Sequence, residues 1–121
     1  MSDPWKIFKT SEYEEWFDDL SEKQKRAIEN KTLKLEIIGP TLGRPDVDHI
    51  KGSQYSNLKE LRVSSDGALR ILFIFDPWRT AVLLIGGNKS AKNEWNAWYQ
   101  RAIPIAEKIY ERYLEQHRRK P

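Results

Sequence analysis

Four cations interrupt a long apolar stretch of the chain, and they are its strongest candidates for chemistry. The stretch from Leu58 to Lys89 reads as three consecutive β-strands, and Lys59, Arg62, Arg70 and Lys89 lie among residues typical of a core. Guanidinium and ammonium groups bind phosphate oxygens through charge-assisted hydrogen bonds. The pattern therefore predicts a meander that is both the core of the fold and the floor of an anion-binding site, with RNA phosphate as the expected anion.

The length of the first turn decides whether the two arginines share a face, because side chains alternate strictly along a strand. If Ser65-Asp66-Gly67 is a three-residue loop, Arg62 pairs with Arg70. Like charges directly opposite each other are destabilising, so this pairing favours a bound phosphate. Two alternatives remain open: Glu60 pairs with one arginine while the other extends into solvent, or a two-residue loop places the arginines on opposite faces.

The second turn decides where Lys89 lies. A four-residue loop over Asp76–Arg79 would pair Arg70 with Ile85, and counting by twos then places Lys89 on the same face. The segment Gly86–Ser90 follows this strand and precedes a helix, so it could form a phosphate-cradling turn, although it lacks the spacing of a P-loop.

The segments before the meander predict a strand and a helical hairpin. A short strand covers residues 5–9, and a capping box Ser11-x-x-Glu14 opens the first helix. A second capping box, Ser21-x-x-Gln24, opens a helix that ends at Gly39-Pro40. Residues 39–57 are expected to form a long loop, a kind of segment that is often functional.

The segment after the meander is expected to be helical. Trp95, Trp98, Tyr99 and Ala102 keep helical spacing, and Pro104 is expected to break or kink the helix or to start a new one. The tail 117–121 is expected to be frayed. The fold class is therefore α+β, in one domain covering residues 1–121.

Composition narrows the classes of function. Of 21 basic and 18 acidic residues, fourteen bases and nine acids lie in residues 41–121, which is compatible with a polyanionic partner. There are no cysteines, the two histidines lack metal-ligand spacing, and no apolar run reaches membrane-spanning length. We expect a soluble, cytoplasmic protein without a metal or cofactor.

Several short motifs resemble one known family. LGRP at 42–45, NLKELR at 57–62, LRILFIFDPWR at 69–79 and LLIGGNKS at 83–90 are similar to the phage-derived, HigB-like branch of the RelE/ParE toxin superfamily. The resemblance covers most of the chain, and the expected order of elements also fits: strand, helical hairpin, antiparallel three-stranded meander and C-terminal helices.

The resemblance implies a toxin of a type II toxin–antitoxin pair. RelE-like members are ribosome-dependent endoribonucleases that cut mRNA, whereas ParE-like members act on DNA gyrase; a non-catalytic domain that binds an antitoxin is the third possibility. The implied partners are a HigA-like helix-turn-helix antitoxin, in a possible heterotetramer, and the ribosome with its mRNA.

The resemblance also implies which residues act. Arg62, Arg70 and Lys89 match the catalytic cations of the RNA-cleaving members, with no metal. The resemblance extends to Lys59 and Lys92 as substrate contacts. Apart from the resemblance, substrate contacts are also expected from Arg44, Trp78 (as an exposed stacking platform) and Tyr99. A catalytic histidine near the C-terminus, found in some relatives, has no well-placed counterpart, so the general base stays open among Lys89, Tyr99 and His49.

Overall fold

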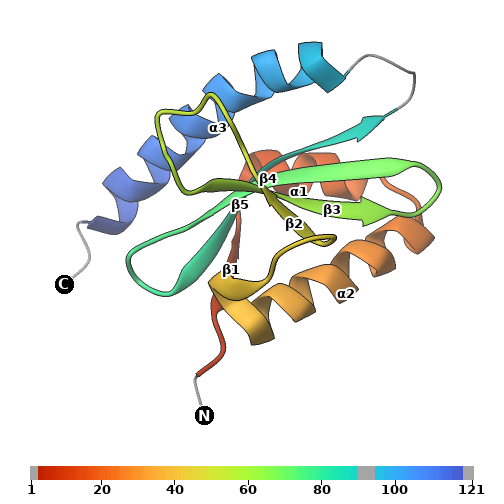
Figure 1. Cartoon of the computed structure of the whole chain (residues 1–121), viewed down its shortest axis with the longest axis horizontal. Coiled ribbons are helices and arrows are strands. Elements are labelled where there is room, and N and C mark those ends of the chain that lie inside the picture. Colours follow the sequence, from red (N-terminus) through yellow and green to blue (C-terminus); the bar gives the residue numbers. More distant parts are fainter. Residues whose placement is uncertain (1–2, 90–94, 119–121) are drawn as a thin grey trace.

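Five strands form one mixed sheet at the centre of the protein (Figure 1). The computed structural model describes residues 3–89 and 95–118. The strand order is β1-β5-β4-β3-β2, with bounds Lys6–Lys9 (β1), Val47–His49 (β2), Leu58–Ser64 (β3), Ala68–Phe75 (β4) and Thr80–Lys89 (β5). β1 runs parallel to β5, and the other neighbours are antiparallel. The expected meander is confirmed as β3-β4-β5.

Helices cover both faces of this sheet. α1 (Ser11–Asp18) and α2 (Glu22–Ile38) pack on one face, and α3 (Trp95–Arg118) packs on the other (Figure 1). Alternate residues of the strands feed the two cores. The α1/α2 face buries Leu61, Val63, Leu69, Ile71 and Phe73, whereas the α3 face buries Leu58, Leu72, Ile74, Val82 and Leu84. Each such side chain stabilises the fold by about 1.5–3 kcal/mol, which explains the apolar character of both faces of β4 and β5.

The first helix is capped one residue earlier than expected. The hydroxyl of Thr10, not that of Ser11, accepts the amide of Tyr13, so the prediction of a capping box at Ser11 is wrong. Thr10 is buried, and its hydroxyl also lies 2.8 Å from the carbonyl of Leu83 and 2.9 Å from that of Leu84. Thr10 therefore both caps α1 and ties it to β5. The second capping box, at Ser21, is confirmed.

The segment 39–57 is more ordered than a plain loop. It contains a 3₁₀ turn, η1 (Gly39–Thr41), and the short edge strand β2, which pairs with β3. Asp46 precedes β2 and is 3% exposed; its carboxylate accepts hydrogen bonds from Lys31 and, at 2.6 Å, from Lys34 of α2. These ammonium groups hold the pKa of the Asp46 carboxyl below its ordinary value. The charge compensation allows the chain to enter β2 against α2.

The C-terminal segment forms one helix rather than two. α3 runs without a break from Trp95 to Arg118 with Pro104 inside it, so the expected break is wrong. Pro104 is exposed, while Ala102 and Ala106 on either side of it face the sheet. Solvent can therefore satisfy the carbonyl that loses its helical partner, and packing of the opposite side holds the helix together. His117 and Arg118, expected to be frayed, belong to this helix.

Candidate functional site

Arg62 and Arg70 lie directly opposite each other on the sheet face that α3 covers. β3 and β4 pair Ser64 with Ala68 and Arg62 with Arg70, which confirms the three-residue loop. Gly67 has the positive φ angle, 120°, that the last residue of such a loop requires, and Asp66 also has a positive φ, of 50°. The cross-strand arginine pair on which an anion site depends is therefore present.

A buried carboxylate lies between the two arginines. Glu60 is 5% exposed, and its carboxylate oxygens lie 3.5 Å from Nε of Arg62 and 3.9 Å from Nε of Arg70. Both alternatives left open by the sequence are therefore wrong: the arginines share one face, and Glu60 contacts both of them instead of one. Glu60 is not among the site residues predicted from the sequence. Its position two residues before Arg62 on an alternating strand was the available signal.

Tyr99 completes the cluster from α3, the helix that covers this face of the sheet. Its hydroxyl donates a hydrogen bond to the carboxylate of Glu60. Burial, and then this hydrogen bond to a carboxylate, raise the pKa of Tyr99 to about 12, while the charge of Arg70 opposes the shift. The phenol is therefore protonated at neutral pH and acts as a donor. We call Glu60, Arg62, Arg70 and Tyr99 the arginine cluster; it holds two positive charges and one negative charge.

The register of the second hairpin differs from the prediction. Arg70 pairs with Gly87 and not with Ile85. The turn is longer than expected, and Leu84 is an extra residue of β5 between the pairs Leu72–Ile85 and Phe73–Leu83. Lys89 pairs through its backbone with Ala68, at the end of the same ladder. Its side chain, and the whole of Lys92, lie outside the described residues.

The glycines Gly86 and Gly87 serve packing rather than a phosphate-cradling turn. Both lie within β5, which extends to Lys89, so the prediction of a turn at 86–90 is wrong for residues 86–89, and Ser90 lies outside the described residues. A Cβ on Gly86 would come within 2.2 Å of the Trp16 ring, and one on Gly87 within 2.4 Å of the Trp98 ring. An indole from α1 and an indole from α3 therefore pack on opposite sides of this strand where a side chain would stand.

Two expected substrate contacts lie away from the arginine cluster. Lys59 alternates with Glu60 and points to the α2 side, where its ammonium donates to the carbonyl of Pro40 at 3.2 Å; burial lowers the pKa of Lys59. Arg44 is exposed and pairs with Asp48 at 2.9 Å.

His49 lies closer to the cluster. It is exposed at the end of β2 and lines a cavity of about 270 Å³ together with Glu60 and Tyr99. Of the other two candidates for the general base, Tyr99 is in the cluster itself, and the side chain of Lys89 is not described. The structure therefore brings Arg62, Arg70, Tyr99 and His49 to one region.

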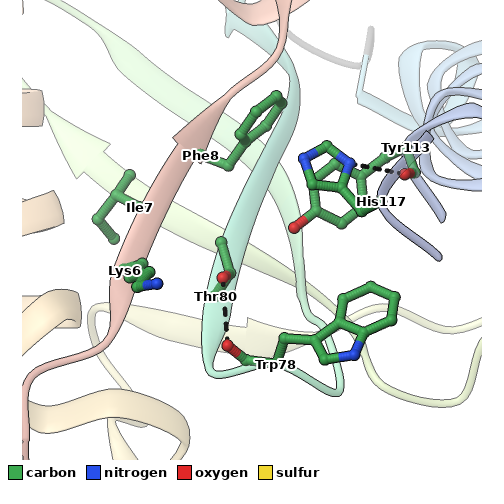
Figure 2. Close-up of a pocket in the computed structure, with 7 residues that line it drawn as sticks. All are labelled: Lys6, Ile7, Phe8, Trp78, Thr80, Tyr113 and His117. Carbon is green, nitrogen blue, oxygen red and sulfur yellow. Dashed lines mark hydrogen bonds between the residues drawn. The ribbon is translucent and has the colours of Figure 1, made fainter. Parts of the chain in front are cut away.

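Trp78 lies in a separate hollow near the other end of α3. It is 45% exposed and borders a cavity of about 620 Å³, whose remaining lining residues are Lys6, Ile7, Phe8, Thr80, Tyr113 and His117 (Figure 2). The Tyr113 hydroxyl donates to the Asp76 carboxylate at 2.5 Å, and the His117 ring stacks on Tyr113. His117 is 18 residues beyond Tyr99, about 27 Å along a helix. The hollow is therefore not an extension of the arginine cluster.

None of the helices within residues 3–89 and 95–118 has the length and hydropathy needed to cross a bilayer.

The family model described as phage derived protein Gp49-like matches residues 15–111. The chain belongs to this family. Two curated Mycobacterium tuberculosis (strain ATCC 25618 / H37Rv) relatives of this Gp49-like protein carry toxin names. It is 44% identical over 101 residues to the one named HigB3, covering 84% of this chain and 86% of that protein. It is 39% identical over 103 residues to the one named HigB2, covering 84% of this chain but only half of that protein.

Solved structures match the chain at the level of the fold. The isolated Escherichia coli RelE toxin matches with a TM-score of 0.59 at 9% identity, covering 81% of this chain and 98% of that one. The toxin of the RelBE2 toxin–antitoxin complex from M. tuberculosis matches with a TM-score of 0.56 at 15% identity, covering 71% and 99%. The Gp49-like chain is thus similar in sequence to HigB toxins, and it shares the α+β fold of RelE.

Proposed function

We propose that this protein is the toxin of a type II toxin–antitoxin system and that it cleaves mRNA on the ribosome, as a single domain acting in the cytoplasm without metal. The observation that carries the proposal is the arginine cluster: a carboxylate, a phenol and two guanidinium groups that meet on one sheet face. These groups supply the three things that metal-independent RNA cleavage needs, namely a base, an acid and a site for phosphate charge.

In the proposed reaction the 2′-OH of one nucleotide attacks the adjacent phosphate. Glu60 accepts the proton of the 2′-OH as the O2′–P bond forms. Arg62 and Arg70 stabilise the negative charge that develops on the phosphoryl oxygens. Tyr99 gives its proton to the departing 5′-oxygen as the P–O5′ bond breaks. The products are a 2′,3′-cyclic phosphate and a 5′-OH.

The hydrogen bond between Tyr99 and Glu60 can then restore the resting state. After the reaction Glu60 carries a proton and Tyr99 has lost one, so transfer along the existing contact returns both groups to their starting forms. Lys89 remains a proposed phosphate contact in this scheme, and Lys92 a proposed substrate contact. Arg44, Lys59 and Trp78 are proposed to contact the ribosome or mRNA away from the scissile phosphate, since they lie outside the cluster.

The proposed partner is a HigA-like helix-turn-helix antitoxin, with which the toxin forms a heterotetramer. Support comes from the toxin names of the two curated relatives and from the solved structures, in which a toxin of this fold is bound to its antitoxin.

Controlled expression in a bacterial host tests the proposal. We expect the wild type and an Arg26→Ala control, which changes an exposed arginine of α2, to arrest growth, and Arg70→Ala and Glu60→Gln not to do so. Tyr99→Phe keeps the ring and should slow cleavage about 10²–10⁴-fold.

Mapping of mRNA 5′ ends, together with a gyrase supercoiling assay, identifies the target. New 5′-OH ends within ribosome-bound messages are expected, with normal supercoiling. Loss of supercoiling activity without such ends would assign the chain to gyrase inhibition instead. Equal arrest by wild type and Arg70→Ala would remove the arginine cluster from the mechanism.

A further inference from the structure

A groove runs from the arginine cluster along α3. Two cavities of about 270 and 420 Å³ lie between the turn at residues 49–52 and the helix at residues 96–107. Both are lined by Lys51, Tyr99 and Ile103, so they are neighbouring parts of one depression, which we call the α3 groove. Its combined size falls in the range of small-molecule sites.

One end of the α3 groove is lined by residues that carry the proposed reaction. Glu60 lines its smaller part, and Tyr99, whose hydroxyl contacts Glu60, lines both parts. If Glu60 takes the proton of the attacking 2′-OH, the ribose of that nucleotide lies at the smaller part. The base attached to this ribose then has the larger part beside it.

The lining suits a nucleobase. Ile103 and the Tyr99 ring are half-buried and offer an apolar and aromatic surface. Asn96 and Gln100 place exposed amides in the larger part, and exposed Lys51 stands where the two parts meet. Stacking on an aromatic ring, together with amide contacts to base edges, is how proteins read an unstacked base of single-stranded RNA.

The wall opposite α3 is held in place by hydrogen bonds. Ser53 donates its hydroxyl to Glu107 at 2.7 Å, and the amide of Gln54 donates to the same carboxylate at 2.8 Å. The Gln54 side chain donates to Glu111 at 2.9 Å, one helical turn further along. The turn is therefore fixed on the helix before any ligand arrives, which lowers the entropic cost of binding.

We propose that the α3 groove binds the nucleotide on the 5′ side of the scissile phosphate and that Gln100 sets the preference for its base. Lys51 contributes attraction to the RNA backbone and no base preference. The assignment rests on the proposed RNA cleavage, and it adds a specificity site to that activity.

The test is the sequence preference of cleavage in cells that express each variant. Wild-type 5′-end maps should show a preferred base immediately before the cut. Gln100→Ala should lose this preference by about fivefold or more and still cleave, because a specific base-edge contact discriminates at that level. Lys51→Ala should reduce cleavage evenly at all sequences, and Lys108→Ala, which removes an exposed lysine elsewhere on α3, should change neither property.

Two results would overturn the proposed role of the α3 groove and leave the proposed RNA cleavage intact. One is a wild type that shows no base preference at that nucleotide, and the other is a Gln100→Ala variant that keeps the wild-type preference. A wild type that cleaves no RNA would remove the proposed function itself, and the groove assignment with it. Gln100→Glu guards against a folding artefact, because it keeps the size of the side chain and should change the preferred base. Urea unfolding of each purified variant should match the wild type.

Discussion

Replacing Glu60 by glutamine removes the charge of this side chain and keeps its shape. The surroundings of Glu60 determine how much this change lowers the stability of the fold. The carboxylate is buried and lies 3.5 and 3.9 Å from two guanidinium nitrogens. Removing one partner of a fully buried ion pair costs about 3–5 kcal/mol. Here the Arg62 side chain is 37% exposed and water screens part of its charge, so we expect Glu60→Gln to lower the free energy of unfolding by about 1–3 kcal/mol.

Urea unfolding measures this loss, and inorganic phosphate shows its cause. The midpoint should fall while the slope stays constant, because the surface exposed on unfolding does not change. Glu29→Gln alters an exposed glutamate of α2 and should stay within about 0.5 kcal/mol of the wild type. Phosphate should then stabilise Glu60→Gln more than the wild type, since the arginines have lost their internal anion. At a concentration tenfold above Kd, bound phosphate adds about 1.4 kcal/mol.

One pair of results would refute the idea that Glu60 is the counter-ion of the arginine pair. Glu60→Gln would unfold at the same urea concentration as Glu29→Gln, and phosphate would shift the wild type and both variants equally. A loss of stability without an added phosphate effect would show that Glu60 supports packing alone and that Arg62 and Arg70 do not form a joint anion site.

Three further substitutions test other parts of the structure. Thr10→Ala should cost about 1–2 kcal/mol in urea unfolding because it removes a helix cap, whereas Ser11→Ala should cost almost nothing. Gly87→Ala should lower the free energy of unfolding by about 1–3 kcal/mol and reduce toxicity, because the new Cβ would meet an indole of α3. Gly43→Ala is the control, because a Cβ at that position has open space around it. Asp46→Asn should remove a stabilisation that is fully present above the ordinary carboxyl pKa of 3.8 and is lost as the pH falls through the lower pKa of the folded state. Urea titrations across this pH range should therefore converge for the wild type and Asp46→Asn at low pH.

The first hairpin could be predicted from sequence because local residues decide its geometry. Ser65, Asp66 and Gly67 form a compact turn with positive φ at its last two positions, and strict alternation then places Arg62 opposite Arg70. Each step needs only neighbouring residues and the period of a strand.

The second hairpin could not be predicted in the same way. Its turn is shaped by the Asp76 carboxylate, which accepts the amides of Trp78 and Thr80, both at 2.8 Å. The extra residue Leu84 sits where Thr10 bonds to the strand, a contact between residues 74 positions apart. The same limit applies to β2, which depends on Asp46 meeting the lysines of α2. The Asp76 turn is local, but the contacts of Thr10 with Leu84 and of Asp46 with α2 join distant parts of the chain and leave no periodic signal in the sequence.

The internal carboxylate also bears on why such a site would depend on the ribosome. Any phosphate that approaches Arg62 and Arg70 competes with Glu60, which is tethered in the same strand and already lies between them. A freely diffusing RNA phosphate competes poorly with a tethered group, because it alone loses translational and rotational freedom on binding. A substrate that is already held and oriented avoids most of this loss, and such positioning can contribute about 7–11 kcal/mol to lowering a barrier. Under the proposed function, the pairing of Glu60 with the arginines therefore weakens cleavage of free RNA and leaves cleavage of ribosome-bound mRNA efficient.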